Sequence, residues 1–446
     1  MIKYDTYKES GIDWIGEIPS HWEVGKVSHL FSFSRGLPIT KQDLRDEGIP
    51  CVNYGEVHSK YGFRVNPEEH LLKCVEIHYL ETNEKSILTK GDFVFADTSE
   101  DIEGSGNFTF LDSEVPTFAG YHTIIARIKG DNEYKYLGYF FDSPFFRNQI
   151  RSNVSGVKVF SITQAILKNS SVLLPEIQEQ TVIALYLDRK TAEIDELIAD
   201  KKRLLELYEE EKTAIINQAV TKGINPNVPM KDSGIEWLGE IPEHWDVSPL
   251  KYLGKFINGY SFKSTDFEST GVRVLKISNI QHMRIDWTDE SFIDDIFYET
   301  HENFRVLEND LVFALTRPII SSGIKVALID NTEHILLNQR NSIYRPTDIN
   351  VKWVYYILLS ANFIQEFDSR IDKTGQQPNI SSNDIGEIKI TIPNEDEQKE
   401  IISFIDEKCG DIENKKTKTE KLIELLTEYR TALVSEVVTG KVKVIE

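Results

Sequence analysis

The chain has 446 residues, of which 40% are hydrophobic and 27% are charged, and its formal net charge is -22. This length allows about two to four domains, each with its own core. No apolar run approaches the roughly 20 residues of a membrane span, and the first residues lack the apolar segment of a signal peptide. We therefore expect a cytoplasmic protein with no membrane partner. The three cysteines have no paired spacing, which argues against a disulfide framework and a zinc site: Cys51, Cys74 and Cys409.

The negative charge by itself argues against nucleic acid as a partner, because Lys and Arg drive phosphate binding. When the chain is divided after residues 170, 225 and 390, each of the four parts is net negative. Any DNA-binding face must therefore be a local patch on an acidic protein.

A tryptophan-rich stretch is the first recognisable element, and it occurs twice. Residues 8–24 read KESGIDWIGEIPSHWEV, and residues 231–247 read KDSGIEWLGEIPEHWDV. They contain four of the six tryptophans: Trp14, Trp22, Trp237 and Trp245. A repeat with so long a period indicates a duplicated domain and predicts an internally two-fold molecule. We expect these stretches to be structural wedges where a domain meets a helix; contact with a partner protein is the alternative.

Residues 25–170 carry the signals of one α+β domain. Short β-branched and aromatic runs, such as 91–96 and 123–128, lie between Gly, Asp and Ser clusters and predict strands. Residues 136–150 predict a short helix that is broken near Pro144.

A long helix is predicted from Pro175 to Gly223, because no proline or glycine interrupts a sequence rich in Leu, Ile, Glu and Lys. Apolar residues spaced three, four and seven apart leave one stripe for a partner: Ile194, Leu197, Leu204, Tyr208 and Ile215. At about 1.5 Å per residue the helix is roughly 65–70 Å long. This length predicts a coiled-coil arm.

The second half repeats this order and ends in a second long helix, predicted at residues 394–438. The halves align at an offset of 218 residues, so we expect two sets of equivalent residues to pair the helices: Leu204, Tyr208 and Ile215 with Leu422, Leu426 and Leu433. The predicted organisation is a first domain at 1–172, a central helix at 173–224, a second domain at 225–390 and a C-terminal helix at 391–446.

The two α+β regions agree in their framework and differ in their loops. Thr98-Ser99 aligns with Thr316-Arg317, and the triplet 120–122 (GYH) aligns with 338–340 (NQR). A shared scaffold with different loops is typical of a recognition surface, although loops also drift without a function.

No catalytic constellation stands out. The sequence has no Gly-rich phosphate loop and no NPPY-like or DPPY-like tetrapeptide. Asp384 with Glu387 and Lys389 resembles a nuclease triplet, but such triplets are common by chance. Their repeat equivalents could not do this chemistry: Ile166, Asn169 and Ser171. His21 and His244, each beside a tryptophan, suit a structural role better than acid–base catalysis.

This architecture resembles the specificity subunit of type I restriction-modification enzymes. In both copies a W-[IL]-G-E-I-P-x-H-W-x-V motif, at residues 14–24 and 237–247, precedes a variable α+β domain. A proline followed by Glu-Gln opens each long helix: Pro175 with Glu179-Gln180, and Pro393 with Glu397-Gln398. The resemblance covers nearly the whole chain.

The resemblance implies a non-catalytic, DNA-reading subunit with two target recognition domains in a pseudo-two-fold arrangement. Each domain would recognise one half of a split double-stranded DNA sequence, and the two helices would pack antiparallel and fix the gap. Two methyltransferase subunits would bind this scaffold, with restriction subunits joining them. S-adenosylmethionine, ATP and Mg²⁺ would belong to those partners, with no cofactor in this chain. The helix ends near Glu179 and Glu397 are candidate contacts for the methyltransferase.

Candidate base-reading residues lie in the loops that differ. Arg suits guanine, and Asn or Gln suits adenine, whereas phosphate contacts only position the protein. In the second domain they are Ser278, Asn279, Arg317, Asn338, Gln339, Arg340, Gln376 and Gln377. In the first domain they are Asn53, Tyr54, Thr98, Ser99, Tyr121, His122 and Lys158.

Two other functions compete with this one. An acidic interaction scaffold, or a decoy that imitates DNA, would never contact bases. An autonomous nuclease would cut DNA with Mg²⁺ through Glu387.

Overall fold

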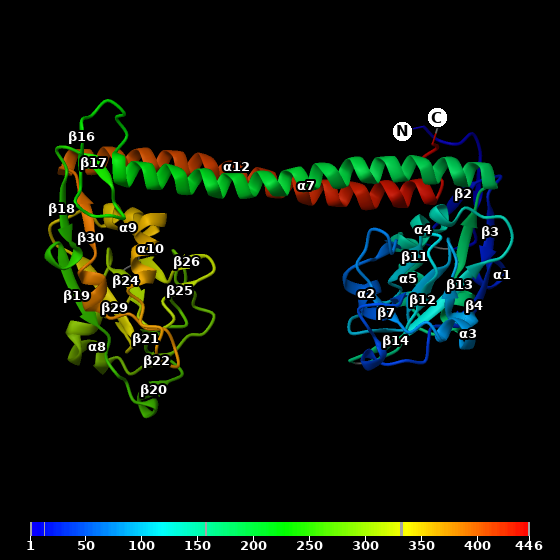
Figure 1. Cartoon of the computed structure of the whole chain (residues 1–446), viewed down its shortest axis with the longest axis horizontal. Helices are drawn as coiled ribbons and strands as arrows, with labels where there is room; N and C mark the ends of the chain where they lie inside the picture. The colour runs from blue at the N-terminus through cyan, green and yellow to red at the C-terminus, as the bar shows by residue number, and fades with distance from the viewer. Residues whose placement is uncertain (1, 13, 157, 331–332, 445–446) are drawn as a thin grey trace. The chain divides into compact units, whose positions relative to one another are not determined.

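The computed structural model describes residues 2–12, 14–156, 158–330 and 333–444 (Figure 1). The chain divides into two compact units. Unit 1 comprises Met1–Lys201 with Lys421–Glu446, and unit 2 comprises Lys202–Glu420. Each unit therefore holds one of the predicted α+β domains together with a part of each long helix.

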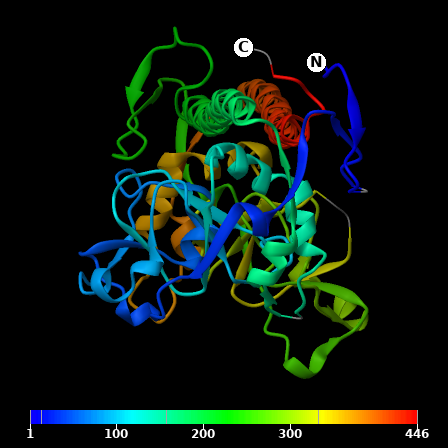
Figure 2. The ribbon, with the colours of Figure 1, turned by 90° about the vertical axis from the view of Figure 1, so that its right-hand side faces the viewer.

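Two sheets build the domain of unit 1, which Figure 2 shows in front. A five-stranded sheet has the order β4 (Phe31–Arg35), β13 (Thr123–Ile128), β9 (Phe93–Ala96), β11 (Phe108–Leu111) and β6 (Phe63–Val65). A four-stranded sheet has the order β7 (Lys73–Val75), β5 (Ile49–Val52), β12 (Thr117–Ala119) and β8 (Ile87–Leu88). The predicted strands at 91–96 and 123–128 are confirmed as β9 and β13. All four residues of β9 are buried, which explains its uninterrupted apolar sequence.

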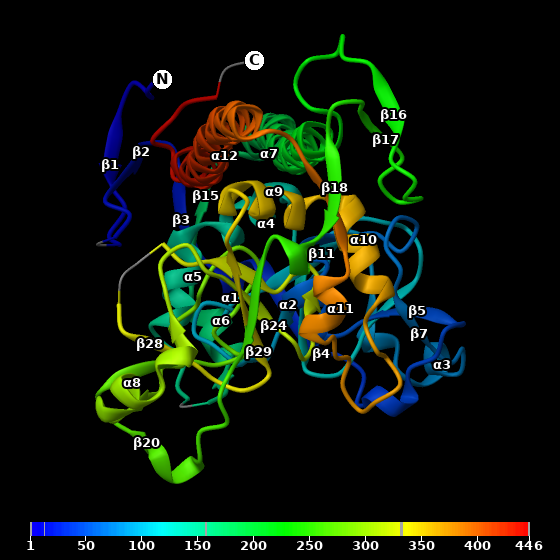
Figure 3. The same cartoon turned by 90° about the vertical axis from the view of Figure 1, so that its left-hand side faces the viewer.

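Unit 2 has the same two-sheet plan, but its sheets differ from those of unit 1 in their outer strands (Figure 3). One sheet has the order β19 (Gly254–Asn258), β29 (Asn341–Pro346), β24 (Leu311–Ala314) and β27 (Val326–Leu328). The other has the order β20 (Phe267–Glu268), β22 (Phe292–Ile293), β21 (Val272–Leu275), β28 (Ile335–Leu337) and β23 (Arg305–Val306). A two-stranded ribbon joins each domain to its long helix: β3 (Glu23–Lys26) with β15 (Ser171–Leu174), and β18 (Asp246–Pro249) with β30 (Lys389–Ile392).

Short elements complete the two domains. In unit 1 these are α1 (Val27–Leu30), α2 (Tyr54–Ser59), α3 (Tyr79–Thr82), α6 (Gln164–Asn169), β10 (Thr98–Ser99) and β14 (Phe160–Ser161). In unit 2 they are α8 (Ile296–Thr300), α11 (Ser382–Gly386), β25 (Ile319–Ile320) and β26 (Gly323–Ile324).

The predicted break near Pro144 separates two helices, α4 (Tyr134–Asp142) and α5 (Pro144–Arg151). Ser143 ends the first helix and caps the second, with its Oγ accepting from the Phe146 N–H at 3.5 Å. Unit 2 makes the same break between α9 (Val351–Leu359) and α10 (Ala361–Ser369) without a proline, because Ser360 caps α10 in the same way.

Both long helices form where the sequence predicts them, as α7 (Ile177–Lys222) and α12 (Glu395–Val438). Gly223 and Gly440 follow the helix ends with φ of 72° and 71°, the left-handed conformation that glycine adopts most easily. Each glycine lies against the buried tryptophan of its unit: a Cβ on Gly223 would lie 3.3 Å from Trp245, and one on Gly440 would lie 3.3 Å from Trp22. No helix in the described ranges is long and apolar enough to cross a membrane.

The helices pair antiparallel within each unit. In unit 1, Arg430 on α12 donates to Asp195 on α7 at 2.8 Å. In unit 2, Lys416 pairs with Glu209, and Lys212 lies 4.0 Å from Glu413. As the residue number rises along α7, that of its partner on α12 falls by the same amount, which defines an antiparallel register.

Less exposed residues of α12 follow a heptad spacing that marks the pairing seam: Ile412, Lys416, Thr419, Ile423, Leu426, Arg430, Leu433 and Val437. Leu426 and Leu433 lie in this seam as expected, and Leu204, Tyr208 and Ile215 are half-buried on α7. Leu422 does not lie in the seam, because it is 40% exposed and the neighbouring Ile423 takes the seam position.

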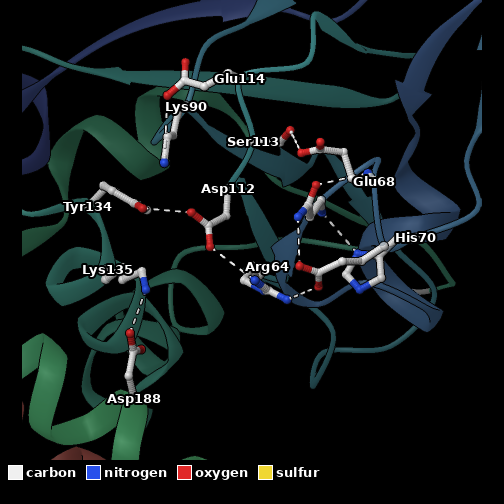
Figure 4. Close-up of polar contacts among 12 residues, drawn as sticks. Arg64, Glu68, His70, Lys90, Asp112, Ser113, Glu114, Tyr134, Lys135 and Asp188 are labelled. Carbon is white, nitrogen blue, oxygen red and sulfur yellow. Dashed lines mark hydrogen bonds and ion pairs between the residues drawn. The ribbon is translucent and has the colours of Figure 1, made fainter.

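Each domain contacts its long helix through a repeat-equivalent aspartate. In unit 1, Asp188 accepts from Lys135 at 2.7 Å (Figure 4). It also accepts from the Tyr139 hydroxyl at 2.8 Å. In unit 2, Asp406 accepts from Lys352 at 2.9 Å and from the Tyr356 hydroxyl.

The tryptophan-rich stretches form hairpins, β1 (Tyr7–Glu9) with β2 (Glu17–Pro19) and β16 (Met230–Asp232) with β17 (Glu240–Pro242). Trp22 and Trp245 are fully buried in the cores of their units, which confirms the wedge for these two residues. Trp14 instead is 54% exposed, and Trp237 is half-buried against Phe363.

The Glu-Gln pairs hold the hairpins and the domains at the helix starts. Glu179 accepts from His21 Nε2 at 2.9 Å, and Glu397 accepts from His244 Nε2 at the same distance. The side chain of Gln180 accepts from the N–H of Glu133, ahead of α4. These residues are therefore engaged inside their own units.

Candidate nucleic-acid interface

The loops that differ between the repeats converge at one edge of each unit. In unit 1, the turn at 120–122 leads into β13, and β10 pairs with β14 beside it. The ring of Tyr54 lies 5.6 Å from those of both Tyr121 and His122. The structure therefore brings Tyr54, Tyr121 and His122 into one aromatic cluster.

Unit 2 brings its arginines to the equivalent edge. Arg340 precedes β29, and the Arg317 N–H donates to the Pro378 carbonyl at 2.8 Å, so the returning loop with Gln376 and Gln377 runs beside Arg317. The Gln339 side chain accepts from the Ser261 hydroxyl at 3.0 Å. Thr316 bridges Asn379 at the place where β10 pairs with β14 in unit 1.

The turns at residues 120–122 and 338–340 are strained in the same way in both repeats. His122 and Arg340 are equivalent residues with φ of 55° and 63°, and Arg317 has φ of 48°. Residues other than glycine rarely adopt this conformation, which costs on the order of 1–3 kcal/mol and tends to persist at functional sites. The carbonyls of His122 and Arg340 both accept from the chain opposite, at 3.1 and 2.8 Å.

At equivalent positions of the two repeats, different side chains hold the turns by hydrogen bonds to the backbone. Thr123 Oγ1 donates to the Gly120 carbonyl at 2.6 Å, and Asn341 Nδ2, at the equivalent position, donates to the Asn338 carbonyl at 3.2 Å. A Cβ on Gly120 would lie 1.9 Å from Asn53 Oδ1, so only glycine fits there.

The expected base-reading residues differ in exposure. Seven are exposed: Lys158, His122, Ser278, Arg317, Gln339, Arg340 and Gln376. Five are half-buried: Tyr54, Thr98, Tyr121, Asn338 and Gln377. Three are buried: Asn53, Ser99 and Asn279.

The buried amides support loops instead of facing DNA. Asn53 is 1% exposed and caps α2, and Asn279 is fully buried. Asn279 Nδ2 donates to the carbonyls of Asp286 and Asp289 at 2.9 and 3.0 Å, and its Oδ1 accepts from the Lys276 N–H. Asn53 and Asn279 each follow an apolar run, which brings them to the edge of a sheet. Their side chains nevertheless point inward and form hydrogen bonds with backbone groups.

Unit 2 carries a basic patch, defined by Arg317, Lys325 and Arg340. Within the described residues neither arginine has a carboxylate partner, although most other arginines of the chain do. Lys325 is 9% exposed and donates to the Ile277 carbonyl at 2.7 Å. Burial lowers the pKa of Lys325, and the charge of Arg317 lowers it further. Such a patch can bind phosphate or the acceptor edge of guanine.

Three basic residues in the body of unit 1 are paired with carboxylates, as Figure 4 shows: Arg64, Lys90 and Lys135. Arg64 lies 3.3 Å from Asp112, and Lys90 lies 3.8 Å from Glu114. Lys158, on the returning loop, is an exposed cation at the edge itself.

The repeat equivalents of the basic patch are Ser99, Asn107 and His122, all uncharged or weakly basic. Beside them lies a cavity of about 750 Å³, whose lining includes the rings of Tyr54, His58 and His122 and the acidic residues Glu100, Asp101 and Glu103. The two edges thus share a backbone and differ in charge. Sequence reasoning missed Lys325, its repeat equivalent Asn107, and Asp97, which directly precedes the selected Thr98.

The nuclease-like triplet is not assembled. Glu387 pairs with Lys251 at 2.6 Å, and Asp384 accepts from Ser381 at the start of α11. No group of His, Cys, Asp and Glu in the described part of the chain could hold a metal ion.

Comparison with known proteins identifies the family. The type I restriction modification DNA specificity domain matches the chain twice, at residues 19–207 and 242–424. The chain belongs to this family. It is therefore a non-catalytic DNA-specificity protein, and the competing scaffold, decoy and nuclease functions lose their support.

Several relatives are named type I restriction enzyme specificity subunits. The MjaVIII subunit of Methanocaldococcus jannaschii is 29% identical over 298 residues, covering 66% of this chain and 67% of its own length. The EcoKI subunit of Escherichia coli is 20% identical over 404 residues, covering 88% of this chain and 83% of its own.

Solved structures share the fold. A chain from a study of complex assembly in a type I restriction-modification system aligns over 95% of this chain and 99% of its own length, with a TM-score of 0.70 and 14% identity. The HsdS subunit of Thermoanaerobacter tengcongensis aligns over 95% and 98%, with a TM-score of 0.55 and 14% identity.

Proposed function

We propose that each unit reads one half of a bipartite DNA sequence, and that the paired helices set the gap between the halves. The observation that carries this proposal is the pair of equivalent, strained turns that present His122 in unit 1 and Arg340 in unit 2. One backbone geometry held in two copies, with different side chains at the exposed position, is what two readers of different sequences require.

The side chains at the edge of unit 2 suit direct reading of bases. Arg340 and Arg317 have no carboxylate partner in the described part of the chain, and an arginine fork matches O6 and N7 of guanine. Gln376 is exposed on the neighbouring loop and suits adenine. The acidic charge of the rest of the chain then confines DNA to this edge and to Lys158 in unit 1.

Two methyltransferase subunits are the proposed partners, one on each unit. Leu425 on α12 and Leu207 on α7 are repeat equivalents, and both are exposed, by 47% and 43%. Leu422 and Tyr429 extend the exposed stripe in unit 1. Apolar residues spaced three and seven apart on an exposed helix face suit packing against a partner helix.

Restriction subunits would join through the methyltransferase. We place S-adenosylmethionine, ATP and Mg²⁺ on these partners, and the whole complex in the cytoplasm with the host DNA.

Mapping methylated adenines tests the reading function. The chain is co-expressed with the methyltransferase subunit of its own system in a host without one, and the genome is sequenced for modified bases. We expect one asymmetric, bipartite motif. A genome without a new methylated motif would refute the proposal.

Substitution in the leucine stripe tests the docking. Leu425→Asp and Leu207→Asp should each remove one methyltransferase subunit from the complex, as measured by light scattering. Leu197→Asp is the matched control, because Leu197 is 47% exposed but its repeat equivalent is Lys415. Full complexes with both stripe variants would show that docking lies elsewhere.

A further inference from the structure

The turn that presents Arg340 in unit 2 presents a different chemical group in unit 1. His122 Nδ1 lies 3.1 Å from Asp97 Oδ1, and the equivalent of Asp97 in unit 2 is Leu315, which has no such group. His122 is 56% exposed on its side chain, whereas Asp97 is 35% exposed beneath it. The pair therefore stands at the reading edge, with Asp97 behind the imidazole.

Asp97 fixes which nitrogen of His122 carries the proton. A carboxylate can only accept a hydrogen bond, so Nδ1 must donate, and in the neutral ring Nε2 then keeps its lone pair. Among the described residues Nε2 has no hydrogen-bond partner. The imidazole makes edge-to-face contacts with two rings, that of Tyr54 at 5.6 Å and that of Tyr121 at 6.0 Å. These contacts hold it in the turn. The pair thus presents an acceptor where Arg340 presents donors.

The cavity beside His122 adds carboxylate acceptors to the same edge. Glu100, Asp101 and Glu103 line the adjoining cavity. Two arginines lie behind this edge: Arg147 is engaged with Asp142 at 2.9 Å and with Asn107 at 2.6 Å, and Arg151 donates to the Glu103 carbonyl at 2.5 Å. A group that donates a hydrogen bond and carries no negative charge is the best ligand for such a site.

We propose that the Asp97–His122 pair reads the N4 amino group of a cytosine in the half-site of unit 1. This inference rests on the proposed function and specifies the chemistry of one of its two readers. In the major groove cytosine shows an amino donor, whereas guanine shows two acceptors. Adenine also shows an amino group, but its neighbouring N7 is an acceptor that would face the lone pair and the carboxylates. Cytosine fits this edge, and His122 contacts the base while Asp97 is the positioning residue.

Base analogues that keep Watson–Crick pairing test the proposal. The chain in complex with its methyltransferase is titrated with duplexes that carry N4-methylcytosine, one position at a time. A methyl group then replaces the amino hydrogen that faces the groove. We expect one cytosine in the first half-site at which affinity falls about ten- to hundred-fold. In Asp97→Asn the same methylation should change affinity less than about two-fold, because an amide can donate to Nδ1 and reverse the tautomer.

Unit 2 supplies the matched control. Arg340→Gln should abolish sensitivity to 7-deazaguanine at one position of the other half-site and leave the cytosine of the first half-site unaffected. Because each variant leaves one unit intact, continued reading of the other half-site shows that the complex still folds.

The outcomes separate this inference from the function on which it rests. A wild-type complex that binds no specific sequence would refute the proposed function. Specific binding with every cytosine of the first half-site tolerant of N4-methylation would refute the cytosine assignment alone. Unchanged sensitivity in Asp97→Asn would remove Asp97 from the reader.

Discussion

Glu179 is the residue on which the hairpin of unit 1 depends. Its carboxylate accepts from the Tyr4 hydroxyl at 2.6 Å, from His21 Nε2 at 2.9 Å and from Trp22 Nε1 at 3.2 Å. Burial and this carboxylate together raise the pKa of Tyr4. Within the described residues of unit 2, the side chain of the equivalent Glu397 keeps only the histidine, and the indole N–H of Trp245 is buried without a partner.

This difference predicts unequal costs for one substitution made in both units. Glu179→Ala leaves a buried hydroxyl and a buried indole N–H without an acceptor, so it should lower the free energy of unfolding by about 2–4 kcal/mol. Glu397→Ala should cost about 1 kcal/mol, because it removes one half-exposed pair. Urea unfolding followed by tryptophan fluorescence measures both. Equal costs would show that the Tyr4 and Trp22 bonds contribute nothing.

At the scale of single residues, the sequence predicted the positions of the candidate residues better than the functions of their side chains. The divergence of residues 120–122 and 338–340 pointed to the two turns that carry the proposed readers, because a shared framework leaves only loops free to differ. The inward turn of Asn53 and Asn279 could not be predicted, since it depends on backbone groups that only the folded sheet brings near. Asp97 escaped selection because its role exists only beside His122, 25 residues away.

The pairing of α7 and α12 is an element-scale property. Proline before each helix and glycine after it made their boundaries predictable within a few residues. The face of α12 that packs on α7 was harder to predict, because residues 422–426 read LIELL and fit a heptad in two phases. Packing selected the phase that buries Leu426 and Leu433 and left Leu422 outside.

Two leucines on one helix test this phase. Leu433→Ala should lower the free energy of unfolding by about 2–4 kcal/mol, because Leu433 is 4% exposed in the core of unit 1. Leu422→Ala should cost less than about 0.5 kcal/mol in the isolated chain. Thermal or urea unfolding of both variants provides the comparison. The reverse order of costs would return Leu422 to the seam.

At the scale of the whole molecule, the helices act as a ruler in the proposed function. Duplicating residues 199–205 in α7 and the facing residues 420–426 in α12 keeps the heptad phase and adds about 10 Å. The methylated motif should keep both half-site sequences and widen its gap by about three base pairs. Binding should weaken as well, because added base pairs also rotate the groove. An unchanged gap in the methylated motif would disprove the ruler.

The N- and C-terminal segments meet in unit 1, where the Lys443 N–H donates to the Ile2 carbonyl at 2.9 Å and the Tyr7 hydroxyl donates to the Gly440 carbonyl at 3.1 Å. In unit 2 the same junction, from Gly223 to the hairpin, is one continuous stretch of chain. The equivalent junctions are thus made by contact between two chain segments in unit 1 and by chain continuity in unit 2. A permuted chain with residues 444 and 2 joined by a short glycine linker, and opened between 224 and 229, should fold and direct methylation of the same motif. If it does, the order in which the two readers are synthesised is independent of what they read.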